Sequence, residues 1–163
     1  MRVFRLCKQA YSETVLSGEG GLVVDGRWHS RGSRIVYTAS SEALAVLETR
    51  MHIGRFVPKA PYAIHEIEIP EAQIQMLPFG DLTRQWNSVP PTQHTRRIGD
   101  DWLRVKSALA LSVPSIHTAT DRNILVNPAH TAASGIEIVD VRPYQFDERL
   151  FAVSARPKPR RRT

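Results

Sequence analysis

The chain has 163 residues, 42% of them hydrophobic, and 22 Lys and Arg against 16 Asp and Glu give it a formal net charge of +6. Five of the basic residues lie in the last eight positions, which hold no acid, so residues 1–155 carry 17 basic and 16 acidic side chains, a net charge of +1. A body so close to neutral excludes a broad basic surface for phosphate backbones, and we expect no direct nucleic-acid binding.

The N-terminal half combines short strands, a glycine-rich turn and one helix. We predict, in chain order, a strand at residues 2–6, a flexible turn at 18–21 that leads into 22–24, a strand at 34–39 and a helix from 43 to about 52. In the second strand Ile35, Tyr37 and Ala39 share one side. Ser40 or Ser41 precedes the helix and is the type of residue that caps a helix N-terminus.

The C-terminal half contains one amphipathic helix and several more strands. Ile98, Trp102, Val105 and Leu109 recur at helical spacing and predict a helix that includes all four. We predict strands at residues 62–69, 110–113, 123–126 and 136–141, and loops with short helical turns at 70–91. Apolar residues alternate with glutamates in 62–69, which is typical of a sheet with one solvated face. Strands outnumber helices without regular alternation, so we predict an α+β fold with mixed sheets.

The whole chain is predicted to hold a single domain at residues 1–155 and a basic tail at 156–163, which Pro157 and Pro159 keep from forming a helix. We expect this tail to be disordered. No segment approaches the roughly 18 apolar residues of a membrane span, and the N-terminus lacks a signal-peptide apolar region, so we expect a cytoplasmic protein without membrane contact. Cys7 is the only cysteine, and the histidines are not spaced as metal ligands are, so no metal site is expected.

Glu48 is a charged residue at a position where the helical pattern predicts an apolar one. Leu44, Leu47 and Met51 define one stripe of the predicted helix, and Glu48 projects within that stripe. A carboxylate on a core-facing stripe is costly unless it is paired or lines a cleft. A structural ion pair, or a position at the edge of the helix, explains the pattern equally well.

Three further residues could carry chemistry. Arg27 follows a glycine-rich turn, and its planar fork suits phosphate, although an exposed turn arginine is the simpler interpretation. Tyr37 is expected to be a buried aromatic with its hydroxyl satisfied, and Trp28 is expected in the core. Ser115 follows Pro114 and is interpreted as a polar group at a strand end, because no nucleophile elbow surrounds it. From these residues alone we predict a polar cleft and no more.

Several short motifs occur together in a specific order and spacing. They are Gly26-Arg27-Trp28, Tyr37-Thr38 and Leu44-Ala45-Val46-Leu47-Glu48, with supporting segments at residues 3–6, 113–115, 123–130 and 146–151. In this combination residues 3–151 resemble the RES-domain family, the toxins of many bacterial toxin–antitoxin pairs, named after an Arg, a Glu and a Ser.

The resemblance implies a fold similar to ADP-ribosyltransferases, with a cleft that binds NAD as a substrate and no separate cofactor. The implied activity is NAD degradation by cleavage of the nicotinamide–ribose bond, with inorganic phosphate as the co-substrate in a phosphorylase. Hydrolysis of NAD and ADP-ribosylation of a protein are the alternatives on the same site. The family's site maps onto Glu48, Arg27 and Tyr37 as catalytic residues, and Arg27, Tyr37, Ser115 and Arg5 as substrate-binding residues.

The resemblance also implies a partner, an Xre/Cro-like helix-turn-helix antitoxin that blocks the cleft. The sequence departs from the family at His29, where Asn is usual, and at Glu42, where Pro is common. His29 bears on substrate preference, whereas Glu42 suits the first turn of a helix. The competing class of protein is a non-catalytic binding module that engages nucleic acid or an acidic partner through the tail.

Overall fold

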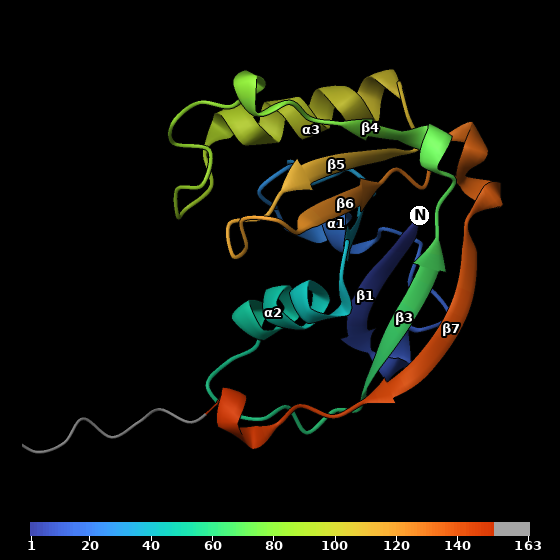
Figure 1. The fold of residues 1–163 in the computed structure, drawn as a ribbon, viewed down its shortest axis with the longest axis vertical. Helices are drawn as coiled ribbons and strands as arrows, with labels where there is room; N and C mark the ends of the chain where they lie inside the picture. The colour runs from blue at the N-terminus through green and yellow to red at the C-terminus, as the bar shows by residue number, and fades with distance from the viewer. Residues whose placement is uncertain (152–163) are drawn as a thin grey trace, which may run out of the picture.

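One seven-stranded sheet organises the chain in the computed structural model, which describes residues 1–151 (Figure 1). Its strands are β1 (Arg2–Lys8), β2 (Val36–Ala39), β3 (Tyr62–Glu68), β4 (Ile74–Met76), β5 (Ala110–Pro114), β6 (Arg122–Val126) and β7 (Glu137–Tyr144). The spatial order is β4-β5-β6-β2-β1-β3-β7, and every neighbouring pair is antiparallel except β4 and β5, which are parallel. The predicted α+β class is confirmed. The predicted boundary at residue 155 and the basic tail at 156–163 lie outside the described residues.

The helices lie beside different parts of this sheet. They are α1 (Gly20–Val23), α2 (Glu42–His52) and α3 (Gln93–Val105), with 3-10 turns at Gln9–Tyr11, Glu71–Gln73, Phe79–Asp81, Thr131–Gly135 and Glu148–Leu150. Figure 1 shows α3 alongside β4 and β5, and α2 at the other half of the sheet, where its contacts are with β1 and β2. Within residues 1–151 no helix is long and apolar enough to cross a membrane.

The two longer helices begin at side-chain caps. Ser41 caps α2 as predicted, because its hydroxyl accepts the backbone N–H of Leu44 at 3.2 Å. Thr92 caps α3, and Lys106 ends that helix in the left-handed conformation with φ 56°. The predicted continuation of α3 to Leu109 is therefore wrong, since the chain turns at Lys106 and Leu109 is buried in the core just before β5.

Three other local predictions need correction. The glycine-rich segment predicted as a flexible turn into 22–24 forms helix α1, and the region 70–91 contains the short strand β4. The solvated face of β3 is confined to Glu66 and Glu68, which are half-buried and paired with Arg2. The first four residues of β3 are buried on both faces, because Tyr62 packs against Phe146 while His65 lies opposite Arg5 of β1.

Gly99 lets α3 pack closely against the segment that carries Arg27. A Cβ at Gly99 would overlap the backbone carbonyl of Trp28, a residue that is 1% exposed in the core. We expect Gly99→Ala to lower the free energy of unfolding by about 1–3 kcal/mol, because neither backbone can yield cheaply. Urea denaturation measures this difference. The matched control is Gly54→Ala, where a Cβ meets nothing within 4 Å; equal stability of the two variants would contradict the packing described here.

Candidate functional site

Glu48 lies on α2 one helical turn after the buried Leu44. The predicted apolar stripe is wrong in part: Leu44 is 1% exposed, whereas Leu47 is 36% and Met51 is 60% exposed. The strand contacts of α2 are with β1 and β2, and Leu47 and Met51 lie increasingly far outside the buried side of the helix. Glu48 therefore sits at the edge of the buried side of the helix, which is one of the alternatives that the sequence left open.

Neutral hydrogen-bond donors hold the Glu48 carboxylate. The hydroxyl of Ser115 and the side-chain amide of Asn123 both donate to Oε1, at 3.0 Å and 2.6 Å. The Nε2 atom of His117 lies 3.6 Å from Oε2. The backbone N–H of His117 donates to the Ser115 hydroxyl at 3.0 Å, so the hydroxyl proton of Ser115 is directed at Glu48. With 26% of its side chain exposed, Glu48 is fixed in orientation and still reachable from solvent.

Arg27 is half-buried and not the exposed turn arginine that the segment alone favoured. Its Nη1 donates to the backbone carbonyls of Trp86 and Ser88, at 2.7 Å and 3.0 Å. Burial lowers the pKa of Arg27, and the nearby charge of Glu48 opposes this effect. Nε and Nη2 make no hydrogen bond with residues 1–151, so three of the five N–H groups of the guanidinium are free for an anion.

Tyr37 on β2, predicted to be buried, is half-buried, whereas its hydroxyl is satisfied as predicted. Its hydroxyl oxygen lies 3.2 Å from the backbone N–H of Trp28 and 2.9 Å from Nδ1 of His29. Burial raises the pKa of the Tyr37 phenol well above its usual value. Trp28 is in the core, as predicted.

Arg5 comes from β1, the neighbour in the sheet of the strand that carries Tyr37. Its Nη1 donates to the backbone carbonyl of Tyr37 at 2.6 Å, and its Nε is buried without a partner among residues 1–151. Burial lowers the pKa of Arg5 from its usual value. Arg5 thus supports the strand position of Tyr37, and its contact with a substrate stays a prediction.

The structure brings all the predicted site residues to one region and adds three that were not predicted as site residues. Arg27 and Tyr37 are close enough to Glu48 that its carboxylate acts to raise the pKa of the Arg27 guanidinium and of the Tyr37 phenol. Asn123, His117 and His29 are the additions. The β5–β6 register, in which Val113 faces Asn123, places Asn123 next to Ser115, and this pairing is the signal that could have found it. Within residues 1–151 no three His, Cys, Asp or Glu side chains group as metal ligands do.

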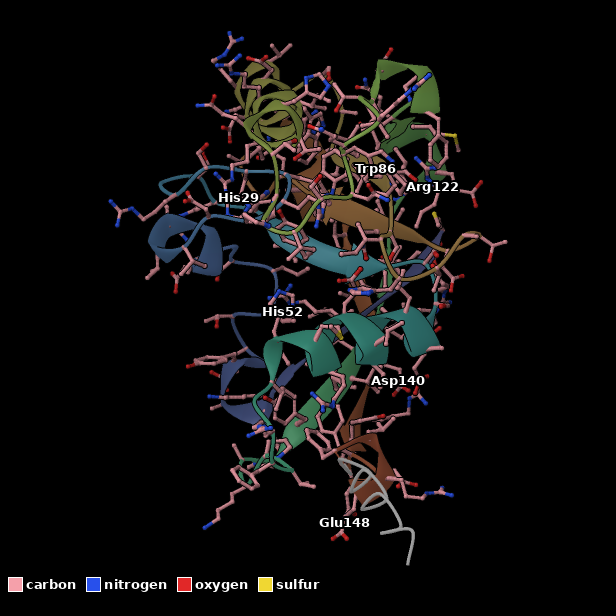
Figure 2. The ribbon with its side chains drawn as sticks, turned by 90° about the vertical axis from the view of Figure 1, so that its left-hand side faces the viewer. His29, His52, Trp86, Arg122, Asp140 and Glu148 are labelled. Atoms are coloured by element: carbon pink, nitrogen blue, oxygen red, sulfur yellow. The ribbon has the colours of Figure 1, made fainter. Side chains whose placement is uncertain are left out.

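Two open grooves lie away from this polar cluster. One, of about 540 Å³, follows the outer face of α2 and is lined by apolar side chains with Glu42, Arg50 and Tyr144. The other, of about 290 Å³, lies between β4 and α3. In Figure 2 the labelled His29 and Trp86 lie on one side of α2, and Asp140 and Glu148 lie on the other. The groove on α2 shares no lining residue with the polar cluster of Arg27, Tyr37 and Glu48.

Together the fold and the site define an α+β protein with a carboxylate held by neutral donors next to an arginine and a half-buried tyrosine. The chain belongs to the RES-domain family, whose sequence model matches residues 2–147. It is 38% identical over 128 residues to "Toxin Res" of Photorhabdus laumondii, which covers 78% of this chain and 82% of that protein.

Two other proteins extend the comparison. The chain is 36% identical over 147 residues to "Prs ADP-ribosylating toxin" of a Sphingobium species, which covers 88% of this chain and 91% of that protein. The fold of the present chain is similar to that of a chain in the crystal structure of the Mycobacterium tuberculosis MbcT–MbcA toxin–antitoxin complex. The TM-score is 0.71 and the sequence identity is 15%, and the match covers 88% of this chain and 84% of that one.

Proposed function

We propose that this chain is the toxin of a bacterial toxin–antitoxin pair and depletes cytoplasmic NAD by cleaving the nicotinamide–ribose bond, with inorganic phosphate as the acceptor. The observation that carries the proposal is the partly exposed Glu48 carboxylate, held by Ser115 and Asn123 and close to Arg27 and Tyr37. Family membership and the similar toxins of named bacteria support it.

Glu48 supplies the negative charge that this reaction needs. Cleavage of a glycosidic bond to ribose passes through an oxocarbenium-like transition state, in which positive charge develops on the sugar. A fixed carboxylate in a partly buried site stabilises that charge without having to reorient, and two neutral donors already fix Glu48. Nicotinamide leaves as a neutral amine and requires no general acid, so one carboxylate suffices.

Arg27 and Tyr37 bind the substrate in this proposal. The free Nε and Nη2 groups of Arg27 hold the pyrophosphate of NAD, or the incoming phosphate, by paired charge-assisted hydrogen bonds. The ring of Tyr37 packs against the nicotinamide or its ribose. Ser115 acts near the leaving amide or the acceptor when NAD binds, in addition to holding Glu48. Arg5 contributes next to Tyr37, whose backbone carbonyl it already contacts.

Nicotinamide release from NAD, with and without phosphate, tests the reaction. Release that depends on phosphate, with a phosphorylated ADP-ribose product, supports the phosphorylase. Release without phosphate would show that the protein is a glycohydrolase and not a phosphorylase. Transfer of labelled ADP-ribose to a protein would show that it is a transferase. The transferase is the second candidate because the Sphingobium relative is named an ADP-ribosylating toxin. No release, together with salt-sensitive retention of DNA, favours the non-catalytic binding module.

The proposed partner is an Xre/Cro-like helix-turn-helix antitoxin. The support is the similarity in fold to a chain from a toxin–antitoxin complex. We expect a helix-turn-helix protein encoded beside this chain to form a complex with it and to stop nicotinamide release. Unchanged release in the presence of excess antitoxin would contradict a partner that blocks the cleft.

The basic tail is not needed for the reaction in this proposal. Deleting residues 156–163 removes five positive charges and leaves the polar cluster around Glu48 unaltered. We expect kcat and KM for NAD to stay within about twofold of the full chain, because screened charges outside the site contribute little. Steady-state kinetics of the truncated and full chains measure this. A loss of turnover as large as that caused by Glu48→Gln would show that the tail belongs to the site.

A further inference from the structure

His29 forms a closed hydrogen-bonded unit with Tyr37. The imidazole is 3% exposed, with Nδ1 at 2.9 Å from the Tyr37 hydroxyl and Nε2 at 3.1 Å from the backbone carbonyl of Val24. A Cβ at Gly26 would overlap both Nδ1 of His29 and the Tyr37 hydroxyl, and a Cβ at Gly21 would crowd Nε2. The backbone therefore surrounds the pair closely, and the ring of His29 cannot turn over in place.

These contacts determine where the protons lie. A carbonyl oxygen only accepts, so Nε2 of His29 carries a hydrogen that it donates to Val24. In a neutral imidazole Nδ1 is then unprotonated and accepts the hydroxyl proton of Tyr37. The backbone N–H of Trp28 occupies a lone pair of the same hydroxyl. The single proton of the Tyr37 phenol is thus committed to His29.

The charged groups around His29 agree with a neutral ring. Burial lowers the pKa of His29 below its usual value of 6.5, and Arg96 of α3 lowers it further. The Val24 carbonyl and the carboxylates of Asp25 and Asp100 act in the opposite direction, but burial is the largest effect.

We propose that His29 is a positioning residue that locks the Tyr37 side chain by accepting its phenolic proton, so that Tyr37 presents its ring to the substrate and does not act as an acid. The assignment rests on the proposed function where it concerns NAD. The hydrogen bond between the Tyr37 hydroxyl and His29, which we call the lock, exists in the free protein and can be measured without NAD.

Nitrogen NMR of the protein with labelled histidine tests the lock without NAD. We expect His29 at pH 7 to be neutral with hydrogen on Nε2, and its Nδ1 resonance to shift in Tyr37→Phe without a change of tautomer. A hydrogen on Nδ1, a charged ring, or an Nδ1 resonance unaffected by Tyr37→Phe would overturn the proposal. Absence of NAD cleavage by the wild-type protein leaves this result intact, so the two failures are distinguishable.

Kinetics of paired variants then test positioning. We expect His29→Leu to lower kcat/KM for NAD about tenfold, the factor that corresponds to the loss of a single hydrogen bond. His29→Asn should restore most of that loss, because its Oδ1 occupies the place of Nδ1 and accepts the same proton. His29→Leu combined with Tyr37→Phe should be no worse than either variant alone. Losses that multiply, or an asparagine variant as impaired as the leucine variant, would overturn the role; the free energies of unfolding show that each variant is folded.

Discussion

Glu48→Gln is expected to reduce the rate of nicotinamide release from NAD by about 100- to 1,000-fold, because a preorganised charge near the reacting centre accounts for barrier reductions of that size. The substitution keeps the shape of the side chain and leaves an amide oxygen that still accepts from Ser115 and Asn123. The variant should therefore fold normally, with a free energy of unfolding within about 1 kcal/mol of the wild type. Turnover measurements and urea denaturation on the same samples separate the two effects.

Glu42→Gln is the matched control for this prediction. Glu42 lies on the same helix, has 40% of its side chain exposed, and pairs with Arg142 of β7 at 3.0 Å. The Glu42→Gln substitution removes the same charge from the same helix at a site away from the polar cluster, so NAD turnover should be preserved. Equal loss of turnover in both variants would show that the net charge of α2 matters, and that the position of Glu48 does not.

Arg27→Ala has the second-largest expected effect, a decrease of about 10- to 100-fold in kcat/KM for NAD, since charge-assisted hydrogen bonds to a phosphate are worth about 1.5–3 kcal/mol. Arg27→Lys should recover only part of the loss, because an ammonium group supplies charge without the planar fork. The Trp86 and Ser88 carbonyls lose their donor in the alanine variant. The lysine variant keeps a donor for one of them and controls for movement of that loop.

Arg34→Ala is the control on the same segment of the chain. Arg34 is exposed, donates to the carbonyl of Ser17 and pairs with Glu19, both away from Glu48. We expect its kinetics to match the wild type. If Arg34→Ala and Arg27→Ala lower kcat/KM equally, a general loss of positive charge explains the effect and the phosphate contact of Arg27 is contradicted.

Much of the fold could be predicted from local patterns. The cap at Ser41, the helix after it and the strand that carries Tyr37 follow from periodicity and capping, which are properties of adjacent residues. The errors lie where tertiary context decides. Leu109 matched the helical spacing, but Lys106 adopts a left-handed conformation and ends α3 first. Met51 matched the apolar stripe, but no part of the described chain covers it.

The site shows the same division between local pattern and spatial arrangement. Glu48, Arg27 and Tyr37 could be named from the motifs, because each motif is short and has a fixed spacing. Their partners could not, because Asn123 is 75 positions from Glu48, and it comes near α2 through the pairing of β6 with β2, where Asn123 lies opposite Ala39. His29 was visible as an unusual residue, but its contact with the Tyr37 hydroxyl depends on the path of the chain around Gly26.

The most direct test compares nicotinamide release from NAD by the wild-type chain and by the Glu48→Gln variant, side by side in phosphate buffer. We predict rapid release by the wild type, loss of that release when phosphate is omitted, and a rate at least about 100-fold slower for the folded variant. Full activity of the folded Glu48→Gln protein would contradict the assignment of Glu48 as the group that stabilises the transition state, and with it the proposed reaction at this site.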